Sequence, residues 1–298
     1  MIQLPDPRMG YSPEAWDEMT LLFHRHPGGR SDLGNRVQAA KESTDPKIKE
    51  ILWWGEPERC SFDERPSDNW WSEQKARPWR FTERRLAKFF LVSQDVPGFP
   101  PRQNWSEIND HKGQVVEGYG KIGYEVEIWL DDSESLLGML RDRADLRIFL
   151  AHGDQTEGVR CTDRFVSWEE VQDNIGPTGL SHLMSCWSND YDISDDDGSY
   201  PFGQGLLHAG CSAVILTHDQ GHHIPGSAKS GGIFEIQRLL GILDRCHKLG
   251  LKAAMEAYRS EYEGMLGPIG ASIIVDHEVA AGDPSWGVLD LEAQSLAV

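Results

Sequence analysis

The sequence lacks the features of a membrane-spanning or secreted protein. It contains no run of about 18 apolar residues, so we expect no transmembrane helix. Residues 1–7 hold neither a basic nor an apolar segment, so we expect no signal peptide there. The five cysteines are odd in number and contain no CxxC pair, which argues against a disulfide framework and a zinc ribbon. Such thiols suit a reducing compartment, and we expect a cytoplasmic protein with no membrane partner.

Positive charge is also scarce. The chain has 29 Lys and Arg against 48 Asp and Glu, for a net charge of -19. Such a field repels phosphate backbones and argues against direct nucleic-acid binding, whereas it favours a basic partner or substrate segment and supports solubility. The sequence contains no GxSxG, Walker A or GxGxxG motif, so serine-hydrolase, nucleotide-hydrolase and dinucleotide functions lose their usual support. We therefore expect no cofactor.

The chain divides into an N-terminal extension, residues 1–82, and a main domain, residues 83–298. The extension is rich in proline, glycine, charge and tryptophan, and its pattern predicts helices over 13–24 and 33–54 and an irregular segment over 55–78. We expect its tryptophans to pack the extension onto the main domain, with a partner-binding face as the alternative.

The main domain alternates predicted strands and helices, which indicates an α/β fold with a mostly parallel sheet covered by helices. Strands are predicted at 89–93, 124–129, 146–151, 183–185, 212–217 and 271–275. Helices are predicted at 105–120, at 133–140 with Asp132 or Ser133 as cap, after Ser167 with Glu170 completing a capping box, at 203–209, and at 234–263 with a break near Gly250. A hairpin is predicted between them at 158–166.

Two of the predicted strands each lead to a reactive residue. The strand at 146–151 runs into His152 and Gly153, and the strand at 183–185 runs into Cys186. The carboxyl ends of parallel strands are where open α/β sheets bind ligands. If the two strands are neighbours, an imidazole and a thiol face one crevice, which is the minimum for a cysteine nucleophile with a histidine base.

The order strand, His-Gly, hairpin, helix and strand-Cys resembles that of the caspase-like cysteine peptidases, in particular their CHAT branch. The resemblance covers about residues 86–280. The segments that carry it are Ile148–Gly153, Leu183–Ser188 and Gly205–Ile215, with Leu249–Met255 similar to a helical segment of that branch. Met184 stands where caspases have glutamine, so the resemblance does not imply their specificity for aspartate. Ser185 stands where metacaspases have aspartate, so it does not imply the substrate specificity of metacaspases either.

The resemblance implies a three-layer α/β/α sandwich and a peptidase mechanism. Cys186 would attack a peptide carbonyl, His152 would carry the proton, and the Gly153 and Cys186 N–H groups would bind the oxyanion, with no third residue required. It also implies one or a few protein substrates and activation by a partner, here through the N-terminal extension. A role in prokaryotic defence is an analogy with other members.

Four residues near the predicted strand ends are candidates for substrate binding: Asp95, Trp187, Asp190 and Asp192. The acidic residues could receive a basic substrate side chain. The segment 190–198 reads as a solvated loop, and its spacing excludes an EF-hand, although another kind of calcium site stays open.

Three alternatives compete with the peptidase interpretation. His218, His222 and His223 could serve a metal-dependent hydrolase, but Gly221 and Pro225 make the required helix improbable, so we expect no metal there and interpret the segment as a loop lining the crevice. The chain could also be a non-catalytic interaction module, or a TIR-like nucleotide module, for which no suitable glutamate is evident.

Overall fold

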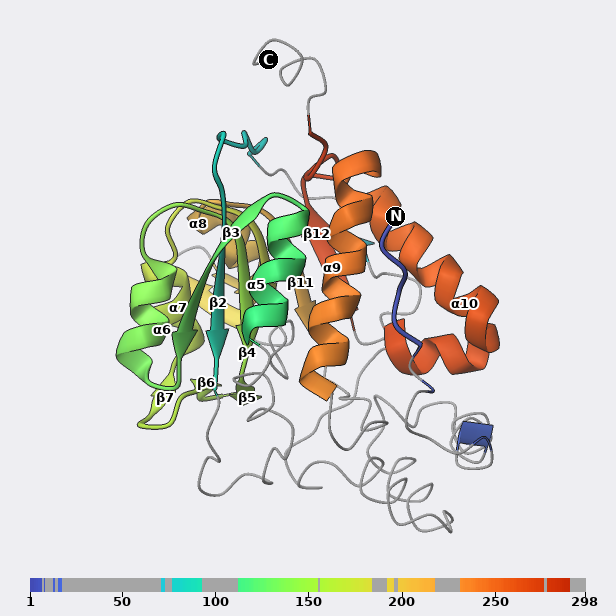
Figure 1. The fold of residues 1–298 in the computed structure, drawn as a ribbon. Helices are drawn as coiled ribbons and strands as arrows, with labels where there is room; N and C mark the ends of the chain where they lie inside the picture. The colour runs from blue at the N-terminus through green and yellow to red at the C-terminus, as the bar shows by residue number, and fades with distance from the viewer. Residues whose placement is uncertain are drawn as a thin grey trace.

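The computed structural model describes residues 1–6, 8, 13, 16–17, 71–72, 77–92, 112–154, 156–183, 192–195, 198–217, 231–275 and 278–289. Within them, seven strands form one sheet in the order β1-β12-β11-β8-β4-β2-β3 (Figure 1). The strands are β1 (Trp71–Ser72), β2 (Arg85–Leu91), β3 (Tyr124–Leu130), β4 (Ala144–Leu150), β8 (Thr178–Leu183), β11 (Cys211–Thr217) and β12 (Glu278–Gly282). All neighbours are parallel except β11 and β12.

Helices cover both faces of this sheet (Figure 1). On one face lie α5 (Lys112–Lys121), α9 (Gly231–Leu249) and α10 (Leu251–Val275), and on the other lie α6 (Ser133–Leu140), α7 (Trp168–Asn174) and α8 (Phe202–Ala209). Each face carries its own cluster of buried apolar side chains. The predicted α/β/α arrangement with a mostly parallel sheet is therefore confirmed. No helix in the described part of the chain is long and apolar enough to cross a bilayer.

The interior strand β4 is buried along its whole length. Leu146, Ile148 and Leu150 pack under α5, α9 and α10, and Phe149 packs against the helices of the opposite face. A strand covered on both faces needs apolar residues at almost every position, which is why this segment reads as a continuous apolar run.

The helix starts follow the predicted capping signals. Asp132 caps α6 by accepting a hydrogen bond from the Ser135 N–H. Ser167 and Glu170 form the expected capping box at the start of α7. These local bonds satisfy amide groups that have no partner within the helix.

A small antiparallel sheet follows β4. It contains β5 (His152–Asp154), β6 (Gly158–Arg160) and β7 (Phe165–Val166), so the predicted hairpin at 158–166 is confirmed. Gly158 has a φ of 103°, and a Cβ there would lie 2.2 Å from the Val166 carbonyl oxygen. Only glycine fits this close approach without strain.

The predicted last strand at 271–275 is wrong. These residues continue α10 beyond a kink at Gly267, where φ is 72°. Ala271 and Val275 are both buried, and their spacing of four residues places them on one helical face. The last strand of the sheet is instead β12, which is antiparallel to β11.

The interpretation of 190–198 as a loop is also wrong in part. Residues Asp192–Asp195 form β9, which pairs with β10 (Gly198–Pro201) in a short antiparallel ladder. The register places Ile193 opposite Tyr200. Residues of these two types favour strands, and this signal outweighs the surrounding aspartates.

Few residues of the N-terminal extension are described. Of its two predicted helices, only residues 13, 16 and 17 are described, and they are helical; the remainder lies outside the described residues. The edge strand β1 pairs with β12, and the Trp79 indole donates to Asp145 Oδ1 at 2.8 Å. The division at residue 82 stays a prediction.

Candidate active site

The two strands that precede the candidate catalytic residues are neighbours in the sheet. β4 and β8 are parallel, and Phe149 is the register partner of Leu183. His152 comes three residues after Phe149, and Cys186 comes three residues after Leu183. The expectation that these strands lie side by side is confirmed. Cys186 itself lies outside the described residues, as do Trp187, Asp190 and Asp95.

The strand order places His152 at a topological switch point. The chain passes from β2 to β3 on one side and then returns to add β4 on the other side of β2. In open α/β sheets, ligands bind in the crevice outside the carboxyl ends of strands where the order reverses. His152 follows the carboxyl end of β4 by two residues.

His152 is held by the small sheet rather than by a free loop. It is the first residue of β5, is 5% exposed and is paired in register with Arg160. The next residue, Gly153, is only partly buried and lies opposite Val159. The Trp168 indole donates to the Asp154 carbonyl at 3.0 Å, which ties β5 to the start of α7. The backbone around the histidine is therefore positioned from two directions.

A buried cluster of polar side chains lies at the same edge of the sheet. His182 on β8 is 1% exposed, and its Nε2 lies 3.5 Å from Glu278 Oε1 at the start of β12. The Arg238 guanidinium of α9 contacts the same carboxylate oxygen at 2.8 Å and donates to the Tyr258 hydroxyl of α10. Because Glu278 is paired in register with Thr217, the last residue of β11, the cluster is at the carboxyl edge.

Two effects on the pKa of His182 oppose one another in this cluster. Burial lowers the pKa of His182, and the nearby Glu278 carboxylate acts to raise it. Burial is the larger effect, so the imidazole is neutral near pH 7. Sequence reasoning missed this cluster. The available signal was a histidine within an apolar strand and an arginine within the apolar part of a helix.

The three cysteines in the described part of the chain are buried. Burial raises the pKa of Cys161 to about 12 and also raises the pKa of Cys211 and Cys246. Because the thiolate is the nucleophile, these thiols are unreactive near neutral pH. Burial of this kind fits a structural role in the core.

The remaining candidates are only partly described. Asp192 is the first residue of β9. His218, His222 and His223, the alternative metal ligands, lie outside the described residues. Among the residues that are described, no group of three or more His, Cys, Asp or Glu side chains is arranged to hold a metal ion.

Comparisons with known proteins find similarity to solved structures but not to a family model or a curated sequence. No protein-family model matches the chain, and no curated protein matches its sequence. Among solved structures, the chain is similar to the Arg-specific cysteine proteinase gingipain R (RgpB), with a TM-score of 0.44 and 17% identity over 68% of this chain and 47% of that chain. A complex of Porphyromonas gingivalis RgpB pro- and mature domains gives a TM-score of 0.41 and 16% identity over 68% of this chain and 48% of that one. This chain thus spans about half the length of those it matches.

Proposed function

We propose that this chain is a cysteine endopeptidase of the caspase-like group, with Cys186 as nucleophile and His152 as proton carrier. The observation that supports this most is the parallel pairing of β4 with β8, in register up to Phe149 and Leu183. The segments that carry the imidazole and the thiol therefore leave the sheet from adjacent strands, at the edge where α/β sheets hold their sites.

The other thiols also favour Cys186. Cys161, Cys211 and Cys246 are buried with raised pKa values, which leaves Cys60 and Cys186 as candidates. Of these two, Cys186 alone follows the strand next to β4 in the sequence.

In the proposed reaction, the Cys186 thiolate attacks the carbonyl carbon of a peptide bond, and the bond from that carbon to nitrogen breaks. The leaving amine takes its proton from the His152 imidazolium. Water then attacks the thioester, gives one proton to His152 and releases the thiolate. The Gly153 and Cys186 N–H groups stabilise the oxyanion at both stages, and loss of one such donor typically costs about 3 kcal/mol of activation free energy.

We also propose the chemistry of the substrate. Asp95, Trp187, Asp190 and Asp192 are assigned to substrate binding. Three of the four are acidic and the chain carries a net charge of -19, so a basic side chain before the cleaved bond fits best. The CHAT-type features of the sequence favour a protein substrate and activation by a partner through residues 1–82. A cytoplasmic location and a role in defence stay predictions.

The test compares digestion of casein and of a peptide library by the parent, Cys186→Ala and His152→Ala. Two variants are matched controls: Cys161→Ala removes a buried thiol, and His208→Ala removes an exposed imidazole. We expect both site variants to lose at least about a thousandfold in rate, because nucleophile and base act as a unit. The two controls retain the parent's rate. Equal cleavage by the parent and Cys186→Ala would overturn the assignment.

A second measurement needs no substrate or activator. The rate at which iodoacetamide alkylates Cys186 reports the fraction of thiolate, which a nearby imidazolium raises. We expect alkylation at pH 7 to slow at least about tenfold in His152→Ala and to stay unchanged in His208→Ala. Slow alkylation in the parent would favour a non-catalytic module. Activity that survives alkylation but is lost with a chelator would favour metal chemistry at His218, His222 and His223.

A further inference from the structure

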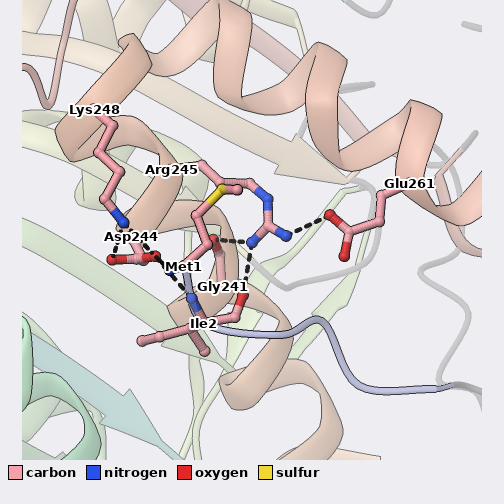
Figure 2. Close-up of polar contacts among 7 residues, drawn as sticks. All are labelled: Met1, Ile2, Gly241, Asp244, Arg245, Lys248 and Glu261. Carbon is pink, nitrogen blue, oxygen red and sulfur yellow. Dashed lines mark hydrogen bonds and ion pairs between the residues drawn. The ribbon is translucent and has the colours of Figure 1, made fainter.

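The first residues of the chain lie along α9 and α10, far from the candidate dyad in the sequence (Figure 1). The Ile2 N–H donates to Asp244 Oδ2 at 2.8 Å, and the Ile2 carbonyl accepts from Arg245 Nη1 at 3.0 Å (Figure 2). Both of these contacts are made to the main chain of Ile2. Two side chains of α9 therefore recognise an extended backbone, whatever the side chain at this position.

Next to these contacts, α9 is shaped to receive one apolar side chain. Leu4 is 1% exposed and belongs to the buried cluster beneath α9 and α10. It lies over Gly241, where a Cβ would come within 2.7 Å of the Leu4 Cδ2 atom. Glycine is unfavourable within a helix, and here it leaves the space that the leucine fills.

Both helices contribute to this recognition. The buried Tyr262 of α10 donates from its hydroxyl to the Pro5 carbonyl at 2.9 Å. Arg245 is held in place by Glu261 of α10 and by the Gly241 carbonyl at 2.8 Å (Figure 2). Asp244 is held by Lys248 at 2.9 Å. Groups fixed in advance lose little freedom when a peptide binds.

We propose that the seam between α9 and α10 is a peptide-binding groove, filled here by the chain's own residues 2–5. The partner that fits it is a protein segment in extended conformation with leucine at its third position, which takes the place of Ile2–Pro5. The main-chain contacts provide affinity for the extended backbone, and the space over Gly241 selects leucine at the third position. This proposal is independent of the peptidase assignment.

A tethered segment competes strongly with any free one. Its effective concentration is in the millimolar range for short flexible connections, so the parent should bind added peptide weakly. Emptying the groove in the full chain should expose the site. Leu4→Asp does this, because it places a charge in the buried leucine position.

The experiment measures the fluorescence anisotropy of a labelled peptide with the sequence of residues 1–8. We expect Leu4→Asp to bind it with a Kd below about 1 mM, and the parent to bind it at least tenfold more weakly. Adding Gly241→Leu to Leu4→Asp fills the space and should weaken binding at least tenfold. A peptide that carries aspartate at the Leu4 position is the control and should not bind.

A second design leaves every groove residue unchanged. A site-specific protease sequence is inserted after Arg8 in the full chain, and the chain is cut there after folding, which circular dichroism checks. The released segment should then exchange with the labelled peptide. If the peptide neither binds Leu4→Asp nor exchanges into the cut chain at 1 mM, the segment is a fixed part of the core and the proposal is wrong.

Discussion

The buried carboxylate of Glu278 allows a sharp test of the structure through the substitution Glu278→Gln. This side chain is 2% exposed and lies between Arg238 and His182. Glutamine has nearly the same shape and keeps an oxygen that can accept from the guanidinium. The substitution therefore removes the negative charge that lies 2.8 Å from the Arg238 guanidinium, a cation that is 1% exposed.

The expected cost is large. Removing one partner of a buried ion pair destabilises a protein by about 3–5 kcal/mol, because the remaining charge stays desolvated. The total free energy of unfolding of a domain is about 5–15 kcal/mol. In a domain of this size each kcal/mol lowers Tm by about 2–4 °C, so we expect Tm to fall by about 6–20 °C in thermal melts followed by circular dichroism.

Two comparisons separate this reasoning from a general effect of the substitution. Glu117→Gln changes a glutamate whose ion pair with Lys121 is exposed on α5, and Tm should not change. The double variant Glu278→Gln/Arg238→Met removes both charges and should recover most of the lost Tm. A Tm within 2 °C of the parent for Glu278→Gln would refute the reasoning, and so would a double variant no more stable than the single one.

Two further predictions concern the half-buried imidazole of His247 and the buried thiols. Burial lowers the pKa of His247 to about 4, and the neutral ring accepts a hydrogen bond from the Arg85 guanidinium. The unfolded chain binds the proton at a pKa of about 6.5, so the free energy of unfolding should decrease as pH falls from about 6.5 to about 4. The difference between the two pKa values corresponds to about 3 kcal/mol of stability. NMR titration of the ring checks the pKa, and urea unfolding at each pH checks the stability. The loss of stability at low pH should be absent in His247→Phe. The buried thiols of Cys161, Cys211 and Cys246 should resist Ellman's reagent at pH 8 in the native chain, so that at most two of the five thiols react before denaturation; a third fast thiol would contradict their burial.

Strands β4 and β11 were predictable because their segments are largely apolar, whereas the strand predicted at 183–185 shares only Leu183 with β8 (Thr178–Leu183). The predicted strand at 146–151 corresponds to Ala144–Leu150, and the one at 212–217 to Cys211–Thr217. Strands β1 and β12 were not predicted. β12 reads Glu-Val-Ala-Ala-Gly, with no apolar run, and it is a strand because β11 and β1 pair with it on either side. Such pairing depends on contacts far along the chain, which a local pattern does not contain.

Some residues of the candidate site could also be predicted from the sequence, and others could not. His152 could be found from the sequence, because it directly follows a strong strand signal. The partners of His182 could not, because Glu278 and Arg238 come from elements that only the fold brings to β8. The contact of Ile2 with Asp244 joins residues 242 positions apart and has no local signature.

Arg147 and His182, two buried polar side chains near opposite ends of the sheet, are satisfied differently. At the amino edge, Arg147 of β4 donates to the carbonyls of Met139, Arg141 and Gly176, at 3.1–3.3 Å, near the end of α6. Main-chain carbonyls at a helix end do not titrate, and they remain when the side chain of their residue is substituted. At the carboxyl edge, His182 depends on the side chain of Glu278. The contact of His182 is therefore sensitive to pH and to substitution of its partner, whereas the contacts of Arg147 do not depend on a partner side chain.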